Sequence, residues 1–196
     1  MKDYKTDLIK DKMSKKIIDS AERIAMGAGE VSVRMILRDL GISNRVFYNR
    51  FHNVDEVLEI VYRNTIAKVR ESMTVEYDGK QDFFEYVIDT VANTLIASYD
   101  VKMKFNQQVF EYDSVSRSNY EWYMKRIKDL FAYAQERGII KDMDFEVMSY
   151  AIWCFCRGYN ADAVMRMPKE EAVENFKYSF RFLLDGLKKE AGNDQK

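Results

Sequence analysis

The stretch SVRMILRDLGISNRVFYNRFHNVDEVL, residues 32–58, predicts two short helices joined by a tight turn and followed by a longer helix. Ser32 and Ser43 can each cap a helix, because a serine hydroxyl accepts a hydrogen bond from the free amides of a first turn. Gly41 stands between them, where a left-handed residue ends a helix well. Residues 53–56 have the spacing of a capping box, so we expect the longer helix to begin there.

The second short helix, expected over about residues 43–51, has an apolar face and a polar face. Phe47 and Phe51 fall on one side of the helical wheel, whereas Arg45, Tyr48 and Asn49 fall on the other. The polar side carries no carboxylate. Arginine matches the major-groove edge of guanine, asparagine matches adenine, and hydroxyl groups suit phosphates. We interpret this face as a surface for a DNA groove, and the alternative is an ordinary solvated surface.

Charge is distributed unevenly along the chain of 196 residues, although the formal net charge is only −1. Residues 1–70 hold 14 basic and 10 acidic side chains, whereas residues 71–196 hold 17 basic and 22 acidic ones. Residues 31–53 contain four arginines and a single acidic residue, Asp39. A basic N-terminal part before a larger acidic part is typical of a protein that binds a polyanion through its N-terminus.

Composition predicts an all-α fold. One proline and eight glycines are too few for the turns of a many-stranded β protein. Apolar periodicity predicts about nine helices, over about residues 6–27, 32–40, 43–51, 53–75, 84–96, 101–110, 120–137, 145–159 and 168–187, with Gly138 ending the seventh and Pro168 as the first residue of the last.

Enzyme, metal and membrane classes receive little support. His52 is the only histidine, and Cys154 and Cys156 are the only cysteines. Two cysteines at i and i+2 of a helix point to different faces, which excludes a mutual disulfide or a shared metal. We therefore expect no catalytic residue, no metal and no cofactor. The start of the chain has no apolar signal region, and no stretch is long and apolar enough to span a membrane, so we expect a cytoplasmic protein.

Residues 17–58 resemble the N-terminal helix-turn-helix of the TetR/AcrR family of transcriptional regulators. The similarity lies in the patterns Ile17-x3-Ala21-x2-Ile24, Ser32-Val33-Arg34-x-Ile36, Leu40-Gly41-Ile42-Ser43 and Phe47-Tyr48-x2-Phe51-x3-Asp55-Glu56-x-Leu58. The resemblance implies a helix-turn-helix DNA-binding domain at residues 1–53 and a helical effector-binding and dimerisation domain at 54–196. It also implies a homodimer, repression, a roughly palindromic double-stranded DNA operator and control by a small-molecule effector.

The resemblance places Ser32 and Arg34 on the DNA backbone, Tyr48 on a phosphate, and Asn44, Arg45, Val46 and Asn49 on the base-reading helix. His52 either contacts a phosphate or is an exposed residue without a role. The full predicted set for DNA is Ser32, Arg34, Ser43, Asn44, Arg45, Val46, Tyr48, Asn49 and His52.

The C-terminal half is rich in aromatic residues and methionine, which either pack a core or line a pocket for a mainly apolar or aromatic ligand. The candidate pocket residues are Phe84, Tyr99, Met103, Phe105, Phe110, Tyr120, Tyr123, Met124, Phe131, Trp153, Phe155 and Arg157, the last as a partner for an anionic group or for another side chain. The last two helices carry apolar residues on more than one face, which predicts burial against a second copy of the chain. The candidate interface residues are Val147, Ala151, Gly158, Phe176, Phe180 and Leu183.

Two other classes remain open. A helical protein-interaction module would bury or neutralise Arg45, Tyr48 and Asn49 and would show no salt-dependent binding to duplex DNA. A small helical enzyme would need polar groups with perturbed ionisation inside the aromatic domain.

Overall fold

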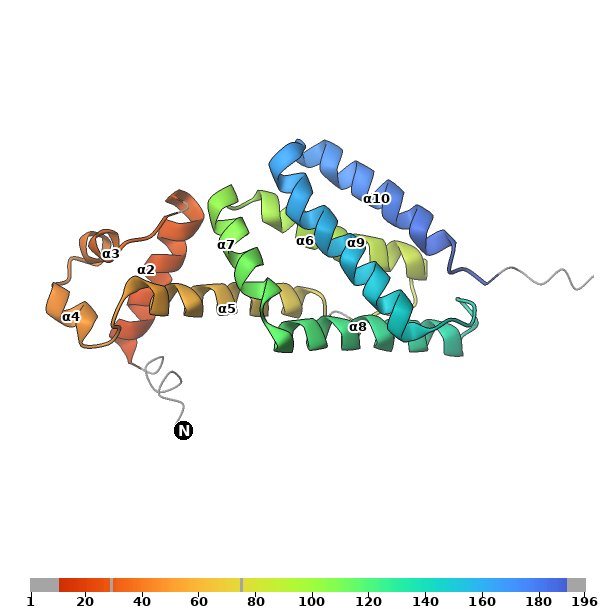
Figure 1. Ribbon diagram of the computed structural model, residues 1–196, viewed down its shortest axis with the longest axis horizontal. Helices are drawn as coiled ribbons and strands as arrows, with labels where there is room; N and C mark the ends of the chain where they lie inside the picture. Colours follow the sequence, from red (N-terminus) through yellow and green to blue (C-terminus); the bar gives the residue numbers. More distant parts are fainter. Residues whose placement is uncertain (1–10, 29, 75, 190–196) are drawn as a thin grey trace, which may run out of the picture. The chain divides into compact units, whose positions relative to one another are not determined.

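The protein is described here by a computed structural model, which covers residues 11–28, 30–74 and 76–189. This part of the chain is all-helical apart from loops and one isolated β-bridge (Figure 1). Its nine helices are α2 (Lys12–Ala28), α3 (Val33–Leu40), α4 (Asn44–Tyr48), α5 (Val54–Ser72), α6 (Phe83–Tyr99), α7 (Met103–Ser114), α8 (Arg117–Glu136), α9 (Phe145–Arg166) and α10 (Lys169–Asp185). The predicted all-α class is confirmed.

Contacts divide the chain into two compact units. The N-terminal unit contains the residues up to 71 together with 100–113, and the C-terminal unit contains 72–99 together with the residues from 114 onward. The domain boundary expected at residue 53 does not coincide with this division. Val57, Ile60 and Val61 of α5 are buried in the core of the N-terminal unit, so α5 completes that core.

The N-terminal unit has one hydrophobic core, formed by α2, α3, α4, α5 and α7. Ile17 and Ala21 of α2, Ile36 of α3 and Phe47 of α4 are each 0% exposed. Phe105 of α7 belongs to the same core at 1% exposed, although its sequence position suggested a residue of the C-terminal half. An apolar stripe shows that a residue is buried but not which core it joins.

The predicted turn between α3 and α4 is confirmed. The Ser32 hydroxyl accepts a hydrogen bond from the Met35 amide at 3.3 Å, which caps α3. Gly41 has φ +63°, and the Ile42 amide donates to the Leu37 carbonyl at 3.1 Å, so the chain leaves α3 through a left-handed residue. A glycine suits this position because a Cβ is strained at such a φ.

Several helix ends differ from the expected ones. α4 ends at Tyr48 and passes into a turn at residues 49–50, whereas α9 continues seven residues beyond Tyr159 to Arg166. Pro168 caps α10 and is not its first residue, because its ψ of 151° is extended. The start expected at residue 6 lies outside the described residues.

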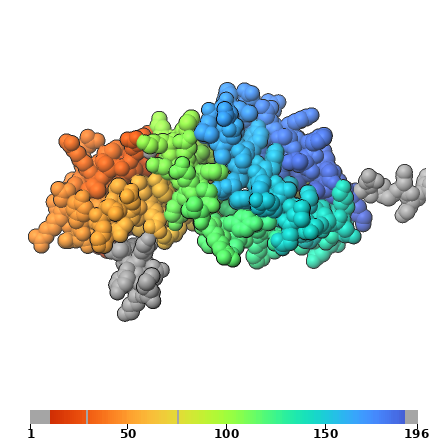
Figure 2. Space-filling model, in the orientation of Figure 1, coloured from red at the N-terminus to blue at the C-terminus, as the bar shows by residue number. Residues whose placement is uncertain are grey.

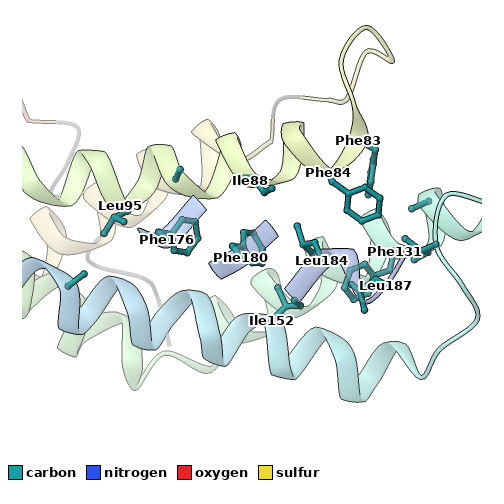
Figure 3. Packing of buried hydrophobic residues seen from close by; sticks show 14 of the residues in the cluster. Phe83, Phe84, Ile88, Leu95, Phe131, Ile152, Phe176, Phe180, Leu184 and Leu187 are labelled. Carbon is teal, nitrogen blue, oxygen red and sulfur yellow. The ribbon is translucent and has the colours of Figure 1, made fainter. Parts of the chain in front are cut away.

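The C-terminal unit packs α6 against α10 and α9 against α8 and α10. Its core includes Ile88 and Leu95 of α6 and Phe176 and Phe180 of α10 (Figure 3). Phe176 and Phe180 are 2% and 0% exposed, and both rings stack on Phe155 of α9. The expectation that they form a dimer interface is therefore wrong, because both side chains are buried in the core of the same chain.

Candidate nucleic-acid interface

The residues predicted to contact DNA lie on α3 or directly before it, on α4, or in the turns that flank α4. The side chains of Ser32 and Arg34 are exposed at the start of α3, and Tyr48 on α4 is 55% exposed. Val46 is half-buried. The other predicted side chains, all exposed, are Ser43, Asn44, Arg45, Asn49 and His52. The structure thus places the predicted set on two consecutive short helices, α3 and α4, and at their ends.

Two phenylalanines hold α4 in place from its inner side. Phe47 and Phe51 are 0% and 1% exposed, and their ring centroids lie 5.8 Å apart. The Tyr48 ring meets the Phe47 ring edge-on at 5.3 Å, which supports the exposed tyrosine from below. Because α4 is only five residues long, this packing and not helix propensity determines how its polar side is presented.

The acidic residue of α3, Asp39, forms its hydrogen bonds within the N-terminal unit. Asp39, at the end of α3, accepts hydrogen bonds from the Ser20 hydroxyl and the Arg23 guanidinium of α2, each at 2.5 Å. These bonds, the one from Ser20 first, lower the pKa of the Asp39 carboxyl. Asp39 therefore joins α3 to α2 as an anion. The charge count from the sequence had only subtracted it from the four arginines of residues 31–53.

Arginines on the outer side of α3 and α4 have no such partner. Arg34, Arg38 and Arg45 are exposed and form no ion pair with any residue that the structure describes. Arg38 was absent from the predicted set, although its position one turn after Arg34 places both on one face of α3. Three arginines without an acidic partner among the described residues thus lie on α3 and α4, together with amide and hydroxyl groups.

His52 is tied to the start of α5. Its backbone amide donates to Glu56 Oε2 at 2.8 Å, and its Nδ1 lies 3.1 Å from Glu56 Oε1. The Glu56 amide in turn donates to Asn53 Oδ1 at 2.9 Å. The predicted capping box is confirmed in this form, with the return bond reaching His52 where Asn53 was expected. The His52 side chain remains 90% exposed.

The hydroxyl groups at the two helix starts differ. The Ser32 oxygen already accepts a bond from Met35, but its own proton is available to a further acceptor. Ser43 caps α4 by position, and its side chain makes no capping hydrogen bond. Both hydroxyls can therefore donate to a phosphate oxygen at a helix N-terminus, where the orphan amides also favour an anion.

The predicted pocket residues do not form one group. Met103, Phe105 and Phe110 belong to the N-terminal unit, whereas the other candidates belong to the C-terminal unit. Phe84, Met124 and Phe131 are buried at 5–6% exposed. The remaining candidates, which include the half-buried Tyr123, are spread over α6, α8 and α9.

Two groups of polar contacts stand out among these candidates. The Tyr99 hydroxyl donates to backbone oxygens at the end of α9, those of Ala163 at 2.9 Å and Met167 at 3.1 Å. Tyr120 meets Trp153 edge-on at 5.2 Å, and the Arg157 guanidinium lies 5.1 Å from the centre of the Trp153 ring. Tyr99 is thus committed to joining α6 to α9, whereas Tyr120, Trp153 and Arg157 form a cluster between α8 and α9.

Apolar side chains remain uncovered on α9 and α10, whose surfaces lie side by side (Figure 2). Val147 is 60% exposed on α9 and Leu183 is 42% exposed on α10; Ala151 and Gly158 are exposed as well. The sequence list had omitted the three large aromatic residues exposed on this surface, namely Tyr150 at 52%, Tyr178 at 73% and Phe182 at 75%. Large aromatic side chains exposed in such a group are unusual for a lone chain.

The two cysteines lie on different sides of α9, as their spacing predicted. Cys154 is exposed, whereas Cys156 is half-buried and burial raises the pKa of its thiol. No group of three or more potential metal-ligating side chains occurs within the described ranges. No helix among the residues described is both long and apolar enough to cross a bilayer.

Comparisons with known proteins identify the fold. No protein-family model and no curated protein matches the sequence. Solved structures do match: a TetR-family transcriptional regulator from Pectobacterium atrosepticum has a TM-score of 0.72 at 13% identity, with 89% of this chain and 93% of that chain covered.

Two further structures cover similar lengths. A TetR transcription regulator from Haloarcula marismortui has a TM-score of 0.70 at 16% identity, with 90% and 98% covered. The fatty acid degradation regulator FadR from Bacillus halodurans has a TM-score of 0.59 at 15% identity, with 87% and 95% covered. The chain therefore has the fold of TetR-family regulators, a helix-turn-helix unit with a C-terminal helical unit.

Proposed function

We propose that this chain is a DNA-binding transcriptional regulator of the TetR family, which binds its operator through α3 and α4. The observation that carries the proposal is the exposed surface around α4, where Arg34, Arg38 and Arg45 have no acidic partner among the described residues. Asp39, the acidic residue of α3, bonds instead to Ser20 and Arg23 of α2. A protein-interaction module would not need this arrangement, whereas a protein that binds the phosphate backbone of DNA does.

Each part of the surface has a role in this proposal. Arg45 and Asn49 read bases through bidentate contacts to guanine and adenine, and Val46 packs against a thymine methyl group. Tyr48, Ser32 and Ser43 donate to phosphates and so set the register of α4 in the major groove. Arg34 and Arg38 add electrostatic attraction from α3.

The regulator acts as a homodimer in this proposal, on a roughly palindromic operator that it represses. Support comes from the apolar surface of α9 and α10, where Val147, Tyr178, Phe182 and Leu183 would be covered by the same surface of a second copy. Two recognition helices in such a dimer need to lie about 34–36 Å apart to enter successive major grooves.

A small, mainly apolar or aromatic effector in the C-terminal unit would change operator affinity by linkage, if it binds better to a dimer with a different spacing. The cluster of Tyr120, Trp153 and Arg157 offers two rings and a cation for such a ligand. The Bacillus halodurans protein with this fold is a regulator of fatty acid degradation, which is in keeping with an apolar effector.

Selection of bound fragments from randomised duplex DNA, followed by sequencing, tests the proposal and yields the operator. Arg45→Ala should then weaken operator binding by about 1–3 kcal/mol and relax the preference at one base pair. Lys68→Ala removes a cation of α5 that pairs with Glu22, and it serves as the control. If no sequence is enriched, and if duplex binding shows no salt dependence, the proposal is wrong.

A further inference from the structure

One arginine beside the recognition helix is held by a carboxylate of another helix. Arg50 lies two residues after α4, and its Nε is 2.5 Å from Oδ2 of Asp11, the residue that precedes α2. Its Nη1 donates to the Val46 carbonyl inside α4 at 2.9 Å. Arg50 thus joins the beginning of α2 to the backbone of α4 itself.

Asp11 is fixed on its own side as well. Its Oδ2 accepts hydrogen bonds from the Ser14 amide at 3.1 Å and from the Ser14 hydroxyl at 3.2 Å, and Ser14 is fully buried. The bond from Arg50, followed by the one from the Ser14 amide, lowers the pKa of Asp11 to about 2. Asp11 is therefore an anion at every physiological pH, and it cancels the charge of Arg50.

Arg50 differs in this respect from the other arginines of α3 and α4. Arg34, Arg38 and Arg45 are exposed without an acidic partner in the described part of the chain, whereas the Arg50 side chain is 27% exposed and paired. Arg50 directly follows Asn49 of the polar side. A long, flexible cation at that place would reach phosphates of any sequence if nothing held it.

We propose that Asp11 is a positioning residue that raises the sequence specificity of this chain, because it keeps Arg50 on the Val46 carbonyl and away from phosphate. The inference rests on the proposed function and concerns residues that the resemblance did not assign. Arg50 then orients α4 and contributes no sequence-independent affinity. Loss of the Asp11 charge releases it, and non-specific binding gains one phosphate contact for each subunit.

Salt titration of binding to a mixed-sequence DNA duplex measures this contact directly. Each phosphate that a cation neutralises steepens the slope of log K against log salt by about 0.9, so Asp11→Asn should steepen it by about 0.9 per subunit. Between about 50 and 200 mM salt this adds a roughly threefold to fourfold loss of affinity per subunit. Asparagine can still cap α2, so the fold should persist, and circular dichroism checks this.

Two further variants and a control complete the test. Asp19→Asn removes the same charge from an exposed site on α2 that pairs with no described residue, and it should leave the slope unchanged. Arg50→Gln should also leave the slope unchanged, because the wild-type arginine is already neutralised. The double variant Asp11→Asn/Arg50→Gln should return to the wild-type slope.

The outcomes separate the two proposals. If the wild-type chain binds duplex DNA but Asp11→Asn behaves like Asp19→Asn, the role of Asp11 is refuted and DNA binding stands. If Arg50→Gln alone flattens the slope by about 0.9 per subunit, Arg50 already contacts phosphate and the role of Asp11 is again refuted. Absence of any salt-dependent binding by the wild-type chain overturns both proposals.

Discussion

Truncation of Phe105 should destabilise the N-terminal unit, although this residue lies on α7 in the middle of the sequence. Its side chain is 1% exposed and its ring centroid lies 6.0 Å from that of Tyr62 on α5. Removal of a buried phenylalanine ring costs about 3–5 kcal/mol through lost burial and the cavity left behind. Phe105→Ala should therefore raise the opening constant of this core roughly 10²-fold to nearly 10⁴-fold.

Hydrogen exchange followed by mass spectrometry locates the effect. Peptides from α2 and α5 should exchange faster in Phe105→Ala, whereas peptides from α6 and α10 should change little. Both tryptophans, Trp122 and Trp153, lie in the C-terminal unit, so the denaturant midpoint of tryptophan fluorescence should also change little.

Two variants keep the experiment decisive. Phe105→Leu retains most of the buried carbon and should lose about 1–2 kcal/mol, which leaves a folded protein if the alanine variant does not fold. Met103→Ala, at a side chain 48% exposed on the same helix, is the control and should stay within about 0.5 kcal/mol of the wild type. Faster exchange confined to α6 and α10 would show that α7 has been assigned to the wrong core.

Three further predictions concern the turn, an ion pair and the proposed dimer. Gly41→Ala should destabilise the protein by about 1–2 kcal/mol in thermal unfolding, because φ is +63° there; an unchanged midpoint would contradict the left-handed turn. Arg181 forms a two-bonded ion pair with Glu85 and lowers the pKa of that carboxyl. Since a lowered folded-state pKa stabilises the fold above the unfolded value, Glu85→Gln should reduce the thermal midpoint near neutral pH; the difference should shrink once the pH falls below the unfolded value of about 4 and vanish below the lowered folded-state pKa. A difference that is independent of pH would refute this. Phe182→Asp should weaken self-association about 10- to 30-fold in sedimentation, unlike Val115→Asp at a site that is even more exposed; equal behaviour of the two variants would show that α10 is not in the interface.

Local signals made α3, α4 and the turn between them predictable. These signals act over only a few residues, so they can be read from neighbouring positions in the sequence. They are the capping serines, a glycine in the left-handed region and two aromatic residues one turn apart. Gly41, Phe47 and Phe51 all behave as expected. The exposed polar side of α4 followed from the same periodicity, because a helix with one buried side must present the other.

Partners that are distant in sequence were not predictable from periodicity. Phe176 and Phe180 were expected in an interface because α10 is apolar on more than one side, yet those two fill the core and Tyr178 and Phe182 are the exposed ones. An apolar helix face does not indicate whether it packs against the same chain or against another. Arg50 was counted with the other basic residues of this stretch, because no sequence pattern links it to a carboxylate 39 residues earlier.

The place of Phe105 has a consequence for how the protein is made. A ribosome releases the chain from its N-terminus, and residues 11–71 emerge well before α7. Until residue 105 has left the exit tunnel, the core formed by α2, α3, α4 and α5 lacks one of its largest rings and exposes the apolar surface that this ring covers. The N-terminal unit can thus reach its full stability only after α7 has been synthesised, so a nascent or prematurely terminated chain that lacks α7 would hold its helix-turn-helix on an incomplete core.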